Sequence, residues 1–208
     1  MTDSSASEGA APRARSIEEF DASYAGTPPW DIGRPQPAFV GLAESGALRG
    51  RLLDVGCGTG EHVLMAARLG LPVTGVDAAP TAIGIARRKA EERRLEARFI
   101  VADALDLAVL GEDFDTVLDC GLFHVFDDDD RTRFVASLHG VMVTGGRYHM
   151  VCFSDLQPGD WGPRRVSQDE IRSSFSEGWQ VASIDAATLD ITISPEGAKA
   201  WLATVVRS

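Results

Sequence analysis

The sequence is poor in cysteine and in positive charge, and it contains no long apolar run. Its three cysteines form neither a C-x-x-C pair nor an even set, so a disulfide framework and a zinc site are both unexpected. No apolar stretch approaches the length that spans a bilayer, and no signal peptide is recognisable. The 20 Lys and Arg stand against 31 Asp and Glu, and a net charge of −11 disfavours binding to nucleic acid or an acidic membrane. We therefore expect a cytoplasmic protein that acts on a small molecule.

The most informative stretch is residues 52–60, which is typical of a buried strand followed by a glycine-rich turn. Gly56, Gly58 and Gly60 allow the backbone to turn tightly and to approach a ligand without an intervening Cβ. Residues 61–70 then have a helical pattern that ends in glycine. A strand, a glycine turn and a helix N-terminus together predict a nucleotide cradle. A tight turn without a ligand is the alternative.

The glycine spacing and one acid indicate which nucleotide this cradle holds. The spacing is Gly-x-Gly-x-Gly, whereas dinucleotide folds have Gly-x-Gly-x-x-Gly. Asp54 precedes the first glycine, where it would repel a pyrophosphate but attract the sulfonium and ammonium groups of S-adenosylmethionine (SAM). The sequence therefore favours SAM over a dinucleotide, with an NAD(P)-binding oxidoreductase as the alternative.

Residues 53–60, Leu-Asp-Val-Gly-Cys-Gly-Thr-Gly, resemble motif I of the class I SAM-dependent methyltransferases, and the resemblance extends from about Trp30 to the C-terminus. It implies an α/β fold, a Rossmann-like three-layer sandwich with a mostly parallel seven-stranded sheet and an antiparallel last strand. It also implies SAM as the cofactor and S-adenosylhomocysteine as the product, and no metal is expected. The composition predicts a disordered tail over residues 1–15 and one domain over residues 16–208. The resemblance implies that residues 16–48 form a helical lid segment of this domain.

Acids at the ends of successive predicted strands complete the cofactor site. Asp77 ends the strand predicted at residues 71–77, where its carboxylate can accept both ribose hydroxyls or cap the following helix. Asp103 follows the next strand, and the resemblance supports a bond to the adenine amino group, with a turn-forming role as the alternative. The cofactor-binding residues that we expect are Asp54, Gly56, Cys57, Gly58, Gly60, Asp77, Ala78, Asp103, Ala104 and Cys120.

A second group of residues is expected to face the methyl acceptor. Residues 28–35 resemble the N-terminal segment of thiopurine, halide and thiol methyltransferases and of bacterial heterocyclic-toxin methyltransferases. This resemblance implies that Trp30 lines the acceptor pocket; the alternative is a plug at the end of the domain. His124 follows a predicted strand and serves as a base, orients the acceptor, or is a core histidine satisfied by a neighbour. The expected acceptor-binding residues are Trp30, Phe123, His124 and Trp161.

The expected reaction is methyl transfer to a thiol, a halide, or an oxygen or nitrogen of an aromatic heterocycle. A sulfonium is already a strong electrophile, so in-line placement and exclusion of water matter more than a powerful base. A protein that binds SAM without catalysis is the alternative, and the expected state is a monomer or a homodimer. The last strands are predicted at residues 147–153, 179–184 and 200–206, after a turn at residues 144–146.

Overall fold

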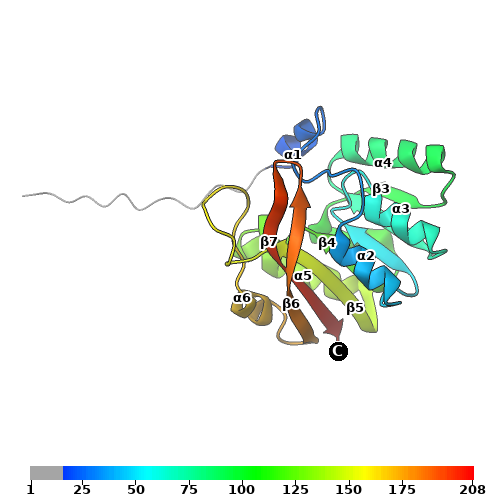
Figure 1. The fold of residues 1–208 in the computed structure, drawn as a ribbon. Helices are drawn as coiled ribbons and strands as arrows, with labels where there is room; N and C mark the ends of the chain where they lie inside the picture. The colour runs from blue at the N-terminus through cyan, green and yellow to red at the C-terminus, as the bar shows by residue number, and fades with distance from the viewer. Residues whose placement is uncertain (1–15) are drawn as a thin grey trace, which may run out of the picture.

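Seven strands form one sheet in the computed structural model, which describes residues 16–208 (Figure 1). The predicted disorder of residues 1–15 lies outside the described residues. The strands are β1 (Leu52–Val55), β2 (Val73–Asp77), β3 (Arg98–Val101), β4 (Phe114–Cys120), β5 (Met142–Phe153), β6 (Trp179–Ile191) and β7 (Ser194–Arg207). Their order across the sheet is β3-β2-β1-β4-β5-β7-β6. Strands β1 to β5 pair in parallel, and β7 is antiparallel to both β5 and β6, which confirms the antiparallel last strand.

Helices cover both faces of the sheet, which confirms the three-layer sandwich (Figure 1). The helices are α1 (Ile17–Ser23), α2 (Pro37–Glu44), α3 (Glu61–Arg68), α4 (Pro80–Arg93), α5 (Asp128–Val141), α6 (Gln168–Ser174) and the 3₁₀ helices η1 (Ala104–Leu110) and η2 (Phe123–Val125). None of the helices within residues 16–208 is long and apolar enough to cross a membrane.

Two hydrophobic cores meet the sheet on alternate residues of β1. Leu52 packs into the core formed with α2, α3 and α4, whereas Leu53 and Val55 pack into the core formed with α5 and α6. All four residues of β1 are buried, including the polar Asp54. A central parallel strand covered on both faces explains the continuous apolar run in the sequence.

The C-terminal half of the sheet extends beyond the predicted strands. β5 begins at Met142 instead of Arg147, and the predicted turn lies inside it as a shift of register opposite Phe114 and Thr116. β6 and β7 pair from Trp179 and Arg207 up to a tight connection after Ile191. Much of this hairpin is partly exposed, so it lacks the apolar run by which the buried strands are recognised.

Side-chain caps are present at the starts of α1 and α5. Ser16 and Glu19 form the reciprocal hydrogen bonds of a capping box at the start of α1. Four consecutive aspartates, residues 127–130, lie at the start of α5, where the Asp127 carboxylate accepts from the Asp130 N–H at 2.9 Å. Acidic side chains at this position also complement the positive end of the helix dipole.

Replacing Gly75 by Ala is expected to destabilise the protein by about 1–3 kcal/mol through overpacking. A Cβ at this position in β2 would lie 2.7 Å from Val63 Cγ2 and 2.9 Å from Cys57 Sγ, which leaves no space for a methyl group. The matched control is Gly84→Ala in α4, where the nearest atom is 3.8 Å away. That change is expected to stabilise the helix by about 0.5–1 kcal/mol. Urea unfolding of both variants measures the difference, and equal midpoints would contradict the packing described here.

Candidate active site

The glycine loop connects β1 to α3 through three residues with left-handed backbone. Gly56, Gly58 and Gly60 have φ of +69°, +51° and +85°. Residues with a Cβ rarely adopt this region of backbone conformation. Gly60 is the N-cap of α3, and its N–H donates to the Cys57 carbonyl at 2.9 Å. The Cys57 N–H in turn donates to Val76 O at 2.9 Å, and its side chain is buried. Cys57 therefore supports the turn, and its thiol faces the core instead of the cradle.

Two neighbouring segments approach the glycines closely. A Cβ on Gly58 would lie 3.0 Å from Tyr24 Oη, and one on Gly56 would lie 3.2 Å from the Leu122 side chain. Tyr24 stands at the end of α1, and Leu122 follows β4. The cradle is thus bounded by the N-terminal segment on one side and by the loop after β4 on the other.

Asp77 braces the glycine loop. Its Oδ2 accepts from the Gly58 N–H and its Oδ1 from the Ala79 N–H, both at 2.8 Å. Burial raises the pKa of this carboxyl, and the two N–H donors act in the opposite direction. Each carboxylate oxygen keeps a second lone pair that can accept from a ribose hydroxyl. Binding of the ribose hydroxyls by Asp77 remains a prediction. Ala78, next to it, is half-buried.

Two buried acids at the ends of adjacent strands have opposite environments. Asp119 accepts from Tyr148 Oη–H at 2.6 Å and from the N–H groups of Leu122 and Phe123 at 2.7 and 3.1 Å. Asp54 is equally buried, with 0% exposure, but neither of its oxygens has a hydrogen-bond partner within residues 16–208. His62 Nδ1 lies 3.8 Å away, beyond hydrogen-bond distance.

The environment of Asp54 fits a positively charged ligand. Burial raises its pKa well above the ordinary value of 3.8, and the carboxylates of Asp119 and Asp77 raise it further. A buried carboxylate is stable in its charged form when a cation or a set of donors compensates it. The orphaned Asp54 and a loop without Cβ atoms therefore fit the cationic methionyl end of SAM.

The remaining residues expected at the cofactor site are Asp103, Ala104 and Cys120. Asp103 is exposed, and its Oδ1 accepts from the Leu105 N–H at 2.9 Å as the cap of η1. This hydrogen bond is the one expected of a turn-forming Asp103, and its bond to adenine remains a prediction. Cofactor binding by the buried Ala104 also remains a prediction. Cys120 ends β4 half-buried, and burial raises the pKa of its thiol well above the ordinary range.

The N-terminal segment is attached to the glycine loop, and the contacts involve Tyr24, Asp31 and Thr59, which the sequence did not single out. Trp30 Nε1 donates to Tyr24 Oη at 3.1 Å, and the two rings meet edge to face. Asp31 Oδ1 accepts from Thr59 Oγ1, within the glycine loop, at 3.1 Å. The Pro-Pro-Trp-Asp stretch thus lies against the cofactor cradle, and the contact of Trp30 with an acceptor remains a prediction.

The other tryptophan predicted for the acceptor side stands on the loop after β5. Trp161 is 39% exposed and meets Phe153 edge to face, with 5.6 Å between ring centroids. The Arg165 guanidinium lies over both rings, at 5.3 Å from Phe153 and 5.7 Å from Trp161. An exposed aromatic side chain on a loop is available to a ligand, and the contact of Trp161 with an acceptor remains a prediction.

Phe123 requires a correction. Its side chain is 0% exposed and stacks on Phe175 with 5.8 Å between centroids, while the Arg131 guanidinium lies 4.5 Å from its ring. The ring therefore belongs to the core beside α5 and α6 and does not line an open acceptor site. The physical reason is the bonding of its N–H to Asp119, which turns η2 so that this side chain points inward.

His124 has the environment of a core histidine satisfied by a neighbour, which is one of the three roles that the sequence left open. It is buried, and its Nδ1 accepts from the Phe153 N–H at 3.0 Å. Burial lowers its pKa to about 3, and the cations Arg131 and Arg165 act in the same direction. Because Nδ1 is occupied as an acceptor, the neutral ring carries its proton on Nε2. A Cβ built on Gly121 would lie 3.3 Å from Nε2, so this N–H lies beside the loop after β4. The role of His124 toward an acceptor remains a prediction.

Replacing His124 by Ala is expected to leave the shape of the pH profile of kcat/KM unchanged between about pH 6 and pH 9. The group does not titrate in that window, because its pKa is about 3. Stability is expected to fall by about 2–4 kcal/mol, since the Phe153 N–H loses its acceptor and a cavity forms. His149→Ala is the matched control, because this buried histidine bonds Thr204 Oγ1 at 2.9 Å on another part of the sheet. Disappearance of a catalytic pKa in His124→Ala alone would contradict this assignment.

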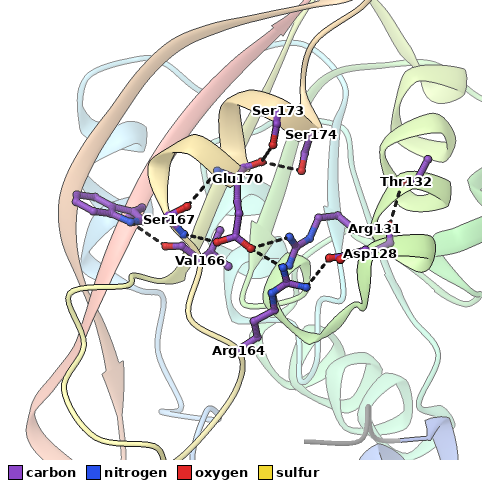
Figure 2. Close-up of polar contacts among 10 residues, drawn as sticks. Asp128, Arg131, Thr132, Arg164, Val166, Ser167, Glu170, Ser173 and Ser174 are labelled. Carbon is purple, nitrogen blue, oxygen red and sulfur yellow. Dashed lines mark hydrogen bonds and ion pairs between the residues drawn. The ribbon is translucent and has the colours of Figure 1, made fainter. Parts of the chain in front are cut away.

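An ion-pair network fixes the start of α6 to the start of α5 (Figure 2). Arg164 donates to Asp128 Oδ1 at 2.6 Å and to Glu170 Oε1 at 2.5 Å, and Arg131 lies 3.6 Å from the same Glu170 oxygen. Figure 2 shows both arginines pointing toward Glu170. Arg164 thus anchors the end of the loop that carries Trp161, and it does not point freely toward an acceptor.

Comparison with known proteins agrees with this geometry. Residues 52–146 match a family model described as a methyltransferase domain. The 2-heptyl-1-hydroxyquinolin-4(1H)-one methyltransferase of Mycobacteroides abscessus is 36% identical over 181 residues, which cover 82% of this chain and 80% of that protein.

Two solved structures extend the comparison. One comes from work on the conversion of a disulfide bond into a thioacetal group during echinomycin biosynthesis; it is 40% identical, with a TM-score of 0.84 and 93% of each chain covered. The SAM-bound magnesium protoporphyrin IX methyltransferase of Synechocystis PCC 6803 shares the fold, with 22% identity, a TM-score of 0.65, and 81% and 76% of the two chains covered. These similarities decide against the NAD(P)-dependent alternative. The chain therefore belongs to the class I SAM-dependent small-molecule methyltransferases.

Proposed function

We propose that the enzyme methylates an aromatic heterocycle at an acidic hydroxyl or ring nitrogen that ionises without help from the protein. The observation that carries this proposal is the state of His124, whose Nδ1 is occupied by the Phe153 N–H. A site without a base at this loop favours acceptors that are already anionic near neutral pH. The relationship to a methyltransferase named for a 1-hydroxyquinolin-4(1H)-one supports the heterocyclic class.

In this proposal the chain's own residues hold and shield the reactants. SAM supplies a methyl group that its sulfonium has already activated. Asp54 compensates positive charge at the glycine loop, and Asp77 binds the ribose while bracing Gly58. Trp30 and Trp161 cover the acceptor and exclude water. In-line placement in a dry site contributes most of the acceleration for this kind of transfer.

A thiol is the second candidate acceptor. It is favoured by the 40% identity to a structure solved in work on a disulfide and its conversion to a thioacetal. A thiolate is softer than a phenolate and likewise needs no base once it is ionised.

Measuring release of S-adenosylhomocysteine across a panel of acceptors tests both candidates. The panel contains 1-hydroxyquinolin-4-ones, phenols and aryl thiols of graded pKa, and iodide, each at several pH values. We expect the rate to follow the ionised fraction of the acceptor and to be highest with the hydroxyquinolones. Fast turnover of phenols that remain protonated would contradict the proposal, and SAM binding without product across the panel would identify a non-catalytic binder.

We propose the same boundaries for the working unit as the sequence predicts. Residues 16–208 form one domain, with residues 16–48 as the lid segment, and the protein acts in the cytoplasm as a monomer or a homodimer. The free thiols of Cys57, Cys120 and Cys152 support a reducing compartment.

A further inference from the structure

A buried series of polar groups runs from Asp54 to the residue that precedes α2. Asp54 Oδ2 lies 3.8 Å from His62 Nδ1 on the first turn of α3. On the opposite edge of the ring, His62 Nε2 accepts from the Gln36 N–H at 3.1 Å. The exposed fractions of Asp54, His62 and Gln36 are 0%, 8% and 2%. The candidate base His124 does not belong to this series, and neither the glycine motif nor the reaction accounts for His62.

The hydrogen bond from Gln36 decides which nitrogen of His62 carries the proton. Burial lowers the pKa of His62 to about 4, so the ring is neutral near pH 7. A neutral imidazole has one N–H, and Nε2 is occupied as an acceptor, so the hydrogen is on Nδ1 and faces Asp54. The Phe39 ring meets His62 edge to face at 4.8 Å and 85°, which limits rotation of the imidazole.

Gln36 is itself held firmly, so the orientation of His62 does not depend on a loose loop. Its side chain exchanges two hydrogen bonds of 2.9 Å with the main chain of Asp190 in β6. Arg34 forms an ion pair of 2.7 Å with the Asp190 carboxylate. The end of the N-terminal segment is thus attached to the β6 edge of the sheet and to His62 at the same time.

We propose that His62 is a positioning residue that directs an N–H at Asp54 and so keeps this carboxylate ionised and aligned for the positive charge of SAM. The Gln36 main chain sets the tautomer that makes this possible. The inference rests on the proposed role of Asp54 in binding SAM, and it adds the group through which that role is maintained.

The charges around Asp54 explain why such a donor is needed. The carboxylates of Asp77 and Asp119, from β2 and β4, both oppose its ionisation. Glu61 lies beside His62, but its charge is compensated by Lys89 and Arg93 at 2.9 and 2.8 Å. The titratable groups that face Asp54 or His62 are Asp77, Asp119, Cys57, Cys120 and Glu61. A directed N–H lowers the free energy of the ionised form without adding a full charge.

The test is the pH dependence of SAM binding by calorimetry in three variants of His62. His62→Phe keeps a ring but removes the N–H, His62→Asn places an amide N–H near the position of Nδ1, and His62→Gln places its amide near the position of Nε2. We expect His62→Phe to shift the pH at which SAM binding weakens upward by about one unit, which is a tenfold loss of affinity on the acid side. Affinity is expected to recover as the pH rises above the shifted midpoint, His62→Asn to keep the wild-type profile, and His62→Gln to behave like His62→Phe.

Loss of affinity by the same factor at every pH in His62→Phe would overturn the inference, because a merely structural role predicts that result. Restoration by His62→Gln and not by His62→Asn would also overturn it. Should His62→Phe not fold, the comparison of the Asn and Gln variants decides. Asp54→Asn separates this inference from the proposal beneath it: unchanged SAM binding in that variant refutes the role of Asp54, whereas weak binding with an unshifted His62→Phe profile refutes His62 alone.

Discussion

Replacing Asp54 by Asn is expected to weaken SAM binding about 100-fold while stabilising the cofactor-free protein by about 1–3 kcal/mol. The carboxylate is 0% exposed and has no hydrogen-bond partner in the described part of the chain. Its pKa in the folded protein is raised well above 3.8, so the native state binds a proton more tightly than the unfolded state does. Stability is therefore lost as pH rises above about 3.8 toward the native pKa. Asn has no charge to bury and avoids that loss.

Thermal unfolding near pH 5 and pH 8, with and without SAM, measures both effects. Without SAM, the extra stability of Asp54→Asn over the wild type is expected to grow with pH. With SAM, the wild type is expected to become the more stable of the two proteins. Asp119→Asn is the matched control, because Asp119 is equally buried but accepts from Tyr148, Leu122 and Phe123. It is expected to destabilise by about 2–4 kcal/mol, since an amide leaves buried donors without an acceptor. Lower stability of Asp54→Asn at pH 8 would show that Asp54 is compensated in some other way.

Replacing Asp77 by Ala is expected to reduce the affinity for SAM and for S-adenosylhomocysteine by the same factor of about 100 or more. Two hydrogen bonds of 2.8 Å to Gly58 and Ala79 are lost, and with them the brace of the glycine loop. The proposed bonds to the ribose are lost as well, and the ribose is common to both ligands. Asp54→Asn differs in this respect, because its effect should be larger on SAM, which alone carries the sulfonium.

Calorimetric titration of both ligands into both variants makes the comparison. Asp103→Asn is the reference, because Asp103 is exposed and caps only a short 3₁₀ helix, so a loss of about tenfold or less is expected. An Asp77→Ala protein that binds either ligand as tightly as the wild type would contradict binding of the ribose by Asp77.

Local sequence signals predicted much of the fold because they act over short distances. The strand, glycine turn and helix from Leu52 to Arg68 follow from apolar patterning and from three positions that require positive φ. The capping boxes that the structure shows at Ser16 and Ser167 each join residues three apart, so they too depend only on local sequence. The antiparallel last strand came from the family resemblance, since no pattern within residues 200–206 specifies its direction.

What the sequence could not predict depends on contacts between distant segments. Gln36 bonds Asp190 across 154 positions of the chain, and no local pattern links them or points to His62. The inward direction of Phe123 depends on Asp119, which accepts its N–H, and on Phe175, which receives its ring. The chain's two tyrosines both touch the site, yet Tyr24 and Tyr148 carry no motif that would have marked them.

The place of β7 between β5 and β6 has a consequence for biosynthesis. β6 is translated before β7 but reaches the rest of the sheet only through it. While β7 is still inside the ribosome, β5 presents an open edge of unpaired backbone groups, which is a template for aggregation. The nascent chain thus closes its sheet late, and translation that stops before Ser194 leaves a product for chaperones and proteases to remove.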